Sequence, residues 1–236
     1  AYSKALTQRN ALLKTLAEIG GDKNQLEPWD DLLARHGASI MHARVLALAA
    51  LEKQAIPIHQ RLTRDLEILQ FHYQPSFEPL KKPSGQMVLP VQTTLDRTGI
   101  SSDELERGLL AALKQSCHAD IQRGQTSLGP HRDEVRLLSN QIDLGDYGSR
   151  GQTRTALLTL KFAEVAWMKQ RTGEWPVLLL DEIMAELDPQ RRKDLLSVVG
   201  QVEQAFLTAT DLDMFTPEFV HEHEVWQVNQ GIVSRS

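Results

Sequence analysis

Apolar residues recur at helical spacing over residues 4–71. One stripe stops at Gly20-Gly21, and a second begins near Trp29 and continues past Pro57. Proline inside a helix removes a backbone hydrogen bond and clashes with the preceding turn, so Pro57 is expected to break or kink the second stripe. The pattern predicts two or three long helices that fold back on one another and pack their stripes together.

A proline-rich stretch follows at residues 74–90, which also contains lysine, serine and glycine. We expect this stretch to form a mobile, exposed connector. Beyond it, Ser101 and Glu104 have the separation of a capping box, and leucines at helical spacing come after them. Residues 1–120 are therefore predicted to form a mostly helical lobe.

Short apolar runs alternate with helical patterns over residues 121–236, which predicts α/β architecture. Val177–Leu180 is an aliphatic run typical of a strand buried on both faces of a parallel sheet. Asp188-Pro189 supplies an N-cap and a first-turn proline for a helix. Ala205–Leu207 and Val225–Val228 are further candidate strands, and the last is expected to end the sheet.

Residues 147–165 read YGSRGQTRTALLTLKFAEV, in which a glycine-serine turn runs into a helical pattern. Gly148 and Gly151 flank Ser149 and Arg150. The N-terminus of a helix presents unpaired N–H groups and the positive pole of the helix dipole. This turn is therefore a candidate site for an anion, including a phosphate.

Asp181 and Glu182 come directly after the aliphatic run, at the edge where open α/β sheets bind ligands. In nucleotide hydrolases the first such acid holds Mg²⁺, and its neighbour can orient the attacking water. Many α/β strands also end in a solvated or helix-capping acid, so both interpretations stay open for the pair alone.

Composition adds limits to these patterns. The chain has 236 residues, of which 41% are hydrophobic and 24% charged, with a net charge of −5. This is ordinary globular composition without a global attraction to nucleic acid. The single cysteine, Cys117, excludes an internal disulfide and is best explained as a small buried side chain. No apolar run approaches the ~18 residues of a membrane span, so we expect a soluble intracellular protein.

The glycine-serine turn, the aliphatic strand with its two acids, and the AELDPQ run occur in an order that resembles the ABC-type ATPases. Ser149-Arg150-Gly151-Gln152 resembles the signature S-G-G-Q, with arginine in place of the first glycine. Val177–Glu182 is similar to a Walker B strand with its catalytic acid. Glu186-Leu187-Asp188 is similar to a D-loop. The combination is more specific than any one of its parts.

A closer resemblance is to the RecF family of bacterial recombination mediators. It rests on TSLGPHRDE at residues 126–134, on YGSRGQTRTALLTLKFAEV, and on LLLDEIMAELDPQRR at residues 178–192. The run QRNALLK at residues 8–14 resembles the opening of the RecF second lobe. The resemblance implies an α/β ABC-type ATPase head, here incomplete, with a mostly helical second lobe.

The resemblance also implies roles for individual residues. Asp181 would hold Mg²⁺, and Glu182 would be catalytic. Six residues would contact ATP, some of them on the nucleotide of a partner subunit: Ser149, Arg150, Gly151, Gln152, Asp188 and Thr210. Thr210 stands where most ABC ATPases have a histidine, and a hydroxyl can donate one hydrogen bond but carries no charge. Slow hydrolysis is therefore expected.

RecF-family proteins bind DNA as ATP-dependent homodimers, and the resemblance implies the same here, without sequence preference, at duplexes or junctions. It further implies action with RecR and RecO in loading RecA at gaps during DNA repair, replication and the SOS response. The location implied is the cytoplasm, at the nucleoid, with no membrane contact.

The sequence contains no G-x-x-x-x-G-K-[ST], the loop that wraps the β- and γ-phosphates. In the family this loop precedes the region that matches Ala1. The chain is thus expected to be the C-terminal two-thirds of a RecF protein, unable to bind ATP alone. Two alternatives stay open: another ATPase of the SMC and RecN type, and a non-enzymatic module that binds DNA or a partner.

Several other residues have two interpretations. Arg132 could pair with phosphate or an acid and His131 could be structural, and we favour the structural interpretation for both. His221-Glu222-His223 lacks a third ligand, so no zinc site is predicted. Scattered basic residues usually only solvate a surface, but the following are candidates for contacts with DNA phosphates: Arg61, Arg64, Lys81, Lys82, Arg123, Arg191, Arg192 and Lys193.

Overall fold

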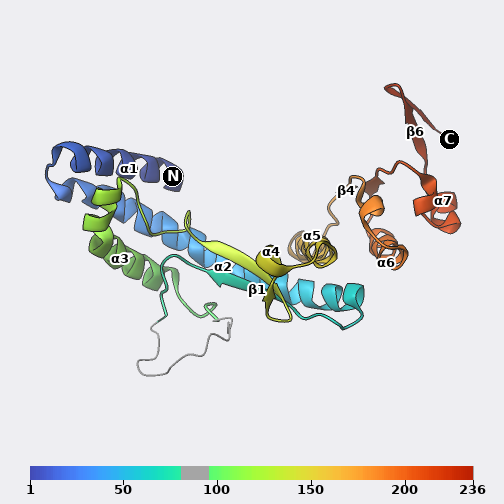
Figure 1. The fold of residues 1–236 in the computed structure, drawn as a ribbon, viewed down its shortest axis with the longest axis horizontal. Helices are drawn as coiled ribbons and strands as arrows, with labels where there is room; N and C mark the ends of the chain where they lie inside the picture. Colours follow the sequence, from blue (N-terminus) through green and yellow to red (C-terminus); the bar gives the residue numbers. More distant parts are fainter. Residues whose placement is uncertain (81–95, 236) are drawn as a thin grey trace. The chain divides into compact units, whose positions relative to one another are not determined.

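The computed structural model describes residues 1–80 and 96–235, and these form two compact units (Figure 1). Unit 1 comprises Ala1–Glu52 and Gln70–Tyr147, and unit 2 comprises Lys53–Leu69 and Gly148–Ser236. The units divide the chain at other points than the predicted boundary between residues 120 and 121. The long helix α2 (Glu27–Thr63) belongs to both units, which a single cut in the sequence cannot represent.

Unit 1 contains the helices α1 (Tyr2–Ile19), the first part of α2, and α3 (Ser102–Arg123), with the short 3₁₀ helix η1 (Lys23–Leu26) between the first two. The predicted long helices are thus confirmed. Helix α1 ends at Gly20, and α3 begins with the predicted capping box. Their apolar faces share a core made of Ala5, Leu33, Ala34, Ala38, Met41, Leu105, Leu109 and Leu113.

Of the predicted break or kink at Pro57, the break is wrong, because α2 continues to Thr63. Proline in a helix interior costs about 3 kcal/mol, and buried neighbours on the same helix, Ala55 and His59, provide packing that offsets this cost. After α2 the backbone turns through two left-handed residues, Arg64 and Asp65, with φ of 54° and 60°.

The helical pattern predicted up to residue 71 is also wrong at its end, where the strand β1 (Leu69–Gln74) begins. Leu66 and Leu69 have helical spacing, but Leu66 is 77% exposed. Leu69, Phe71 and Tyr73 are instead buried on one face of the strand. The relevant signal was this alternation with a period of two residues.

Strand β1 lies in a three-stranded sheet with β2 (Glu134–Ser139) and β3 (Ile142–Asp143), in the order β1-β2-β3. Strands β2 and β3 form an antiparallel hairpin, followed by the short helix α4 (Leu144–Tyr147). Of the predicted connector, residues 81–90 lie outside the described residues.

Unit 2 is built around the helix α5 (Arg150–Thr172) and a βαβ segment formed by β4 (Leu178–Leu180), α6 (Pro189–Val199) and β5 (Ala205–Leu207). Strands β4 and β5 pair in parallel, as the sequence predicted. The core of the unit combines Leu62 from α2 with residues of these elements: Leu158, Phe162, Val165, Leu178, Met184, Leu187, Leu195, Leu196 and Val199.

The prediction that β4 is buried on both faces is wrong. Leu178 is 7% exposed and belongs to the core, whereas Leu179 is 72% exposed. Its register partner Phe206 on β5 is 56% exposed. Only one face of this two-stranded sheet packs against the helices of the unit. The other face of the aliphatic run is exposed among the described residues.

The chain then passes through two short 3₁₀ segments and a helix to a hairpin: η2 (Ile183–Glu186) before α6, then η3 (Leu212–Met214), α7 (Pro217–Glu222), β6 (Trp226–Asn229) and β7 (Ile232–Arg235). The predicted strand near Val225–Val228 exists as β6. It does not end the sheet of β4 and β5, because it pairs with β7 in a sheet of its own. The two residues between β6 and β7 have positive φ, which suits a tight hairpin turn, so β6 pairs with the strand that follows it in sequence.

Candidate nucleotide-binding site

The N-terminus of α5 is formed by residues 149–152, which we name the signature turn. Ser149 is the N-cap, and its Oγ accepts a hydrogen bond from the backbone N–H of Gln152 at 3.2 Å. Gln152 Oε1 in return accepts from the N–H of Ser149 at 3.1 Å. This reciprocal capping box fixes the turn locally, and it explains why serine and glutamine stand three residues apart.

Gly151 is the second residue of α5 and does not have a positive φ. A Cβ added there would meet only Arg191 Nη1 at 3.9 Å and Ser149 Oγ at 4.0 Å. Neither backbone conformation nor packing inside the chain therefore requires glycine, although glycine disfavours a helix relative to alanine. Its effect is to leave the surface over the helix end uncovered, next to backbone N–H groups.

The first residues after β4 carry the two predicted acids. Thr208, directly after β5, donates a hydrogen bond from its Oγ1 to Asp181 Oδ1. The same Oγ1 accepts from the backbone N–H of Glu182 at 2.9 Å. The hydroxyl of Thr208, at the end of β5, thus contacts both acidic residues at the end of β4.

Glu182 has the left-handed backbone conformation, with φ 49° and ψ 14°. A non-glycine residue there carries about 1–3 kcal/mol of strain, and such strain clusters at functional sites. The conformation turns the chain sharply from β4 into η2 and leaves both carboxylate-bearing residues exposed. The pair is accessible to a ligand.

Asp188 is the N-cap of α6, and its Oδ1 accepts hydrogen bonds from the N–H groups of Gln190 and Arg191, each at 3.0 Å. Its Oδ2 lies 3.2 Å from Arg191 Nη1. The hydrogen bond from the Arg191 N–H, aided by the charge of that side chain, holds the pKa of Asp188 below its usual value. Arg191 thus lies between the cap of α6 and the signature turn.

The structure brings the predicted residues together in two groups. Ser149, Gly151 and Asp188 lie around Arg191, and Asp181 and Glu182 lie around Thr208. Arg150 is the exposed first residue of α5.

Sequence reasoning chose Thr210, which is exposed in the loop after β5, and did not consider Thr208. A usable signal existed: Thr208 follows β5 directly, as Asp181 follows β4. Carboxyl ends of neighbouring parallel strands meet at one edge.

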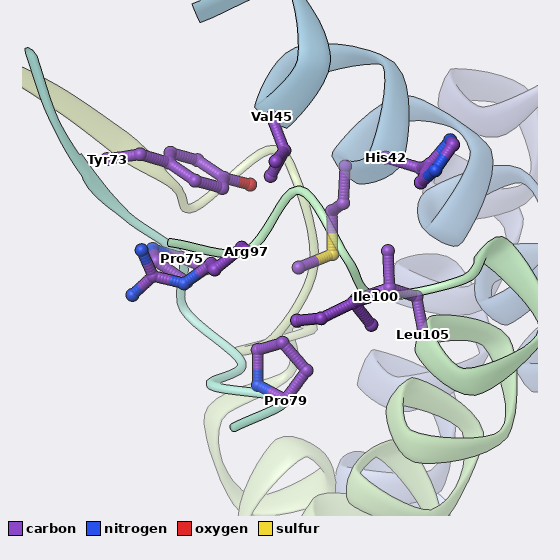
Figure 2. Close-up of a pocket in the computed structure, with 9 residues that line it drawn as sticks. His42, Val45, Tyr73, Pro75, Pro79, Arg97, Ile100 and Leu105 are labelled. Atoms are coloured by element: carbon purple, nitrogen blue, oxygen red, sulfur yellow. The ribbon is translucent and has the colours of Figure 1, made fainter. Parts of the chain in front are cut away.

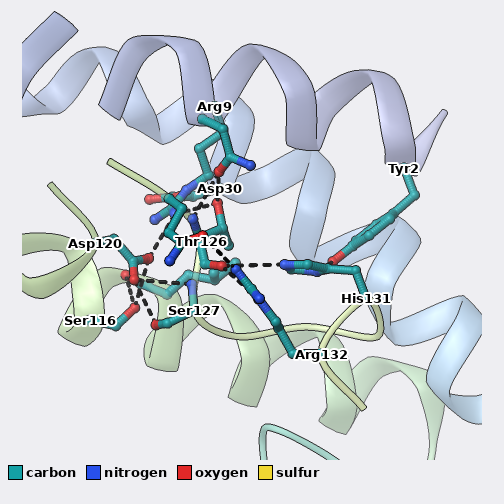
Figure 3. A network of polar contacts seen from close by, with 12 residues as sticks. Tyr2, Arg9, Asp30, Ser116, Asp120, Thr126, Ser127, His131 and Arg132 are labelled. Atoms are coloured by element: carbon teal, nitrogen blue, oxygen red, sulfur yellow. Dashed lines mark hydrogen bonds and ion pairs between the residues drawn. The ribbon is translucent and has the colours of Figure 1, made fainter. Parts of the chain in front are cut away.

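The loop at residues 128–133, in unit 1, is held by a network of polar contacts (Figure 3). His131 Nδ1 lies 2.8 Å from the hydroxyl of Tyr2. Burial of the His131 imidazole lowers the pKa of that ring. Arg132 donates to Gln125 Oε1 at 2.9 Å and to the carbonyl of Thr126. These contacts support the structural interpretation of both residues.

Close to this loop, Arg9 is completely buried and forms ion pairs with Asp30 at 2.7 Å and Asp120 at 2.8 Å (Figure 3). Arg9 also donates to Thr126 Oγ1 at 2.9 Å. Burial raises the pKa of Asp30 despite the attraction of Arg9. The network joins α1, α2 and α3 to the chain that leads into the 128–133 loop.

A small pocket in unit 1 has mainly apolar walls from α2, the chain after β1 and the start of α3 (Figure 2). Arg97 lines it, but its guanidinium is paired with Glu78. The pocket is lined by Met41, His42, Val45, Tyr73, Pro75, Pro79, Arg97, Ile100 and Leu105. None of these is a predicted site residue.

The candidate DNA contacts are scattered over the described residues. Arg123 lies in unit 1, whereas Arg61, Arg64, Arg191, Arg192 and Lys193 lie in unit 2. Lys81 and Lys82 lie outside the described residues. Arg192 donates from Nε to the carbonyl of Met184 at 2.8 Å, so it also has a structural contact.

No helix in residues 1–80 and 96–235 is long and apolar enough to cross a membrane. Within the same ranges, no three side chains of His, Cys, Asp or Glu are grouped so that they could hold a metal ion.

The capped turn, the parallel βαβ segment and the two acids after its first strand define the class. This is an incomplete α/β head of the ABC-type ATPases with a mostly helical second lobe. A scan against protein-family models found no match.

The chain is 36% identical over 232 residues to the DNA replication and repair protein RecF of Exiguobacterium sp., covering 98% of this chain and 58% of that protein. It is 37% identical over 239 residues to the protein of the same name from Heliobacterium modesticaldum, covering 100% of this chain and 58% of the relative. The chain corresponds to a C-terminal portion of the RecF family. It spans about 58% of the length of these curated relatives.

Two solved structures match over almost the whole chain at 29% identity. Both are described as the recombination mediator protein RecF in the RecFOR pathway, one with ATPrS and one with ATP. The TM-scores are 0.77 and 0.78, and the chain covers 56% of each.

Proposed function

We propose that this chain supplies two parts of a composite ATP site in a DNA-repair ATPase of the RecF type. The observation that carries the proposal is the uncovered helix end at Gly151 in the same unit as the exposed acids Asp181 and Glu182. The first part fits an anion, and the second fits a cation and a water molecule.

In this proposal the signature turn serves the nucleotide held by a second subunit. Ser149 and the N–H groups near Gly151 approach its γ-phosphate, since a helix N-terminus favours an anion and Gly151 adds no side chain to this one. Arg150, Gln152 and Asp188 complete the surface around the turn. The ATP then joins two copies of the protein, and hydrolysis separates them.

The acids serve the nucleotide on their own subunit. Asp181 would hold Mg²⁺, and the hydrogen bond from Thr208 orients its carboxylate. Magnesium is commonly bound by one or two carboxylates together with phosphates and water, so a single acid fits this ion. Bound Mg²⁺ neutralises charge on the phosphate oxygens, and Glu182 orients the attacking water. Thr210 remains a candidate contact for the γ-phosphate.

Productive ATP binding by these residues alone is not expected, because the sequence contains no G-x-x-x-x-G-K-[ST]. Isothermal titration showing tight Mg-ATP binding to this chain would refute this part of the proposal.

We further propose that the ATP-dependent homodimer closes over DNA at gaps or junctions and acts with RecO and RecR to promote RecA loading, in the cytoplasm at the nucleoid and within the SOS response. The name of the relatives and the pathway given for the solved structures support this assignment. The exposed side chains of Arg61, Arg64 and Lys193 are candidates for contacts with DNA phosphates.

Sedimentation of the complete gene product with and without ATP tests the composite site. Ser149→Arg introduces bulk over the helix end, and Ser149→Ala removes the same capping hydroxyl without bulk. We expect Ser149→Arg to abolish ATP-dependent dimerisation and leave ATP binding by single subunits intact, while Ser149→Ala retains dimerisation. Equal dimerisation of both variants would contradict the role of the turn. An unaltered protein without any nucleotide dependence would favour a non-enzymatic binding module.

A further inference from the structure

One carboxylate in unit 2 joins the loop after α2 to the signature turn. Glu67 Oε1 accepts a hydrogen bond from Gln152 Nε2 at 3.3 Å. Glu67 Oε2 lies 3.4 Å from His59 Nε2, and the side chains of Glu67 and His59 are 16% and 0% exposed. The contact crosses 85 positions of sequence between Glu67 and Gln152.

The amide of Gln152 is held at both ends. Its Oε1 accepts from the N–H of Ser149, and its Nε2 donates to Glu67. Because the amide has only one oxygen, the partner on Nε2 determines that the oxygen faces the cap. Glu67 therefore favours the amide orientation that closes the capping box.

Threonine hydroxyls continue these contacts along α5. Thr155 Oγ1 donates to the carbonyl of Gly151, and Thr159 Oγ1 donates to the carbonyl of Thr155, each at 2.8 Å. His59 Nδ1 lies 3.0 Å from Thr159 Oγ1. Because the proton of that hydroxyl is already donated to Thr155, His59 Nδ1 carries the proton and donates to Thr159. A chain of hydrogen bonds thus runs from His59 to Gly151.

We infer that Glu67 is a positioning residue for the signature turn, and that His59 anchors the first turns of α5 to the end of α2. The inference rests on the proposed function, in which the turn contacts the nucleotide of a second subunit. A turn whose cap is held from outside the helix presents its N–H groups in one fixed direction, which favours binding of a phosphate.

Two mild substitutions separate the reach of the Glu67 side chain from its charge. Glu67→Asp keeps the charge but shortens the side chain, so its carboxylate withdraws from Gln152 Nε2. Glu67→Gln keeps an acceptor for Gln152 Nε2 at the same distance and loses the charge. Glu164→Asp is the matched control, because Glu164 lies on α5 in an exposed pair with Lys161.

The readouts on the complete gene product are ATP binding by single subunits, thermal stability and ATP-dependent dimerisation. We expect Glu67→Asp to weaken dimerisation about tenfold, the equivalent of one hydrogen bond to a charged group, with ATP binding unchanged. Glu67→Gln should stay within about threefold of the unaltered protein, and Glu164→Asp should match that protein.

The inference is overturned if Glu67→Asp dimerises like Glu164→Asp, if Glu67→Gln is as damaging as Glu67→Asp, or if ATP binding and thermal stability fall together with dimerisation. The unaltered protein separates this failure from failure of the proposed function. If it does not dimerise with ATP, both the proposed function and the inference fail; if it does, only the role of Glu67 is at issue.

Discussion

Thr208 donates a hydrogen bond to the carboxylate of Asp181 across the ends of the two parallel strands of unit 2. Its oxygen also accepts from the N–H of Glu182, whose backbone is left-handed. A single hydroxyl therefore orients one acid and supports the strained backbone of the other.

Thr208→Val should separate the role of the hydroxyl at the two acids from any role of Thr208 in folding. Valine has a similar shape but no hydroxyl, so Asp181 loses a donor and the N–H of Glu182 loses its acceptor. We expect ATP turnover by the complete gene product to fall by about tenfold or more, since a hydrogen bond to a charged group is lost at an exposed site. The unfolding midpoint should change little.

Thr210→Val is the matched control for that experiment, because Thr210 is exposed in the next loop. If hydrolysis depends on the Thr208 contact, the two valine variants differ in turnover. A larger loss in Thr210→Val would instead favour the residue chosen from sequence.

Gly151 offers a second test, because an added Cβ would make only ordinary contacts, with Arg191 Nη1 at 3.9 Å and Ser149 Oγ at 4.0 Å. Gly151→Ala should leave the free energy of unfolding unchanged or raise it by up to about 1 kcal/mol, since alanine favours the helix. The same change should weaken ATP-dependent dimerisation, because the methyl group covers the helix end. Denaturant unfolding and sedimentation measure the two effects.

Gly124→Ala is the contrasting variant, because Gly124 has φ +62° and its Cβ would lie 3.1 Å from Lys14 Cγ. It should destabilise the protein without a specific effect on dimerisation. If Gly151→Ala behaved in the same way, the glycine of the signature turn would be structural.

Arg9 gives a prediction for stability alone. Arg9→Met leaves Asp30 and Asp120 buried without their cation, and breaking such a group by removing one partner costs about 3–5 kcal/mol. The exposed pair of Arg35 and Glu106, 3.9 Å apart, is the control, and Arg35→Ala should cost less than about 1 kcal/mol. Similar losses in urea unfolding for both variants would contradict the structural role of the buried network.

Local signals in the sequence predicted local structure well. The capping box of Ser101 and Glu104 and the N-cap of Asp188 depend only on neighbouring residues, and both are confirmed. The glycine-serine turn likewise opens a helix, and the order of motifs identified the family. The two caps and the glycine-serine turn are set by backbone hydrogen bonding within one turn of chain.

Features that depend on distant contacts were not predictable in the same way. Strand β1 was assigned to a helix because Leu66 and Leu69 imitate helical spacing, and its strand partner β2 lies some sixty residues later. The pairing of Glu67 with Gln152 has no sequence signal of its own. Strand β4 is buried on just one of its faces. This depends on what packs against the sheet, which a hydrophobic run does not specify.

The central claim is that the signature turn of one subunit completes the ATP site of another. Mixing two variants of the complete gene product tests it most directly. Ser149→Arg damages the turn, Asp181→Asn damages the acids, and a mixed dimer contains one intact composite site. Each variant alone should show almost no ATP turnover. Mixing should restore turnover, up to about a quarter of the original activity, since the mixed dimer keeps one of its two composite sites and that site can join the subunits. Activity of the mixture no higher than that of either variant alone would contradict the account.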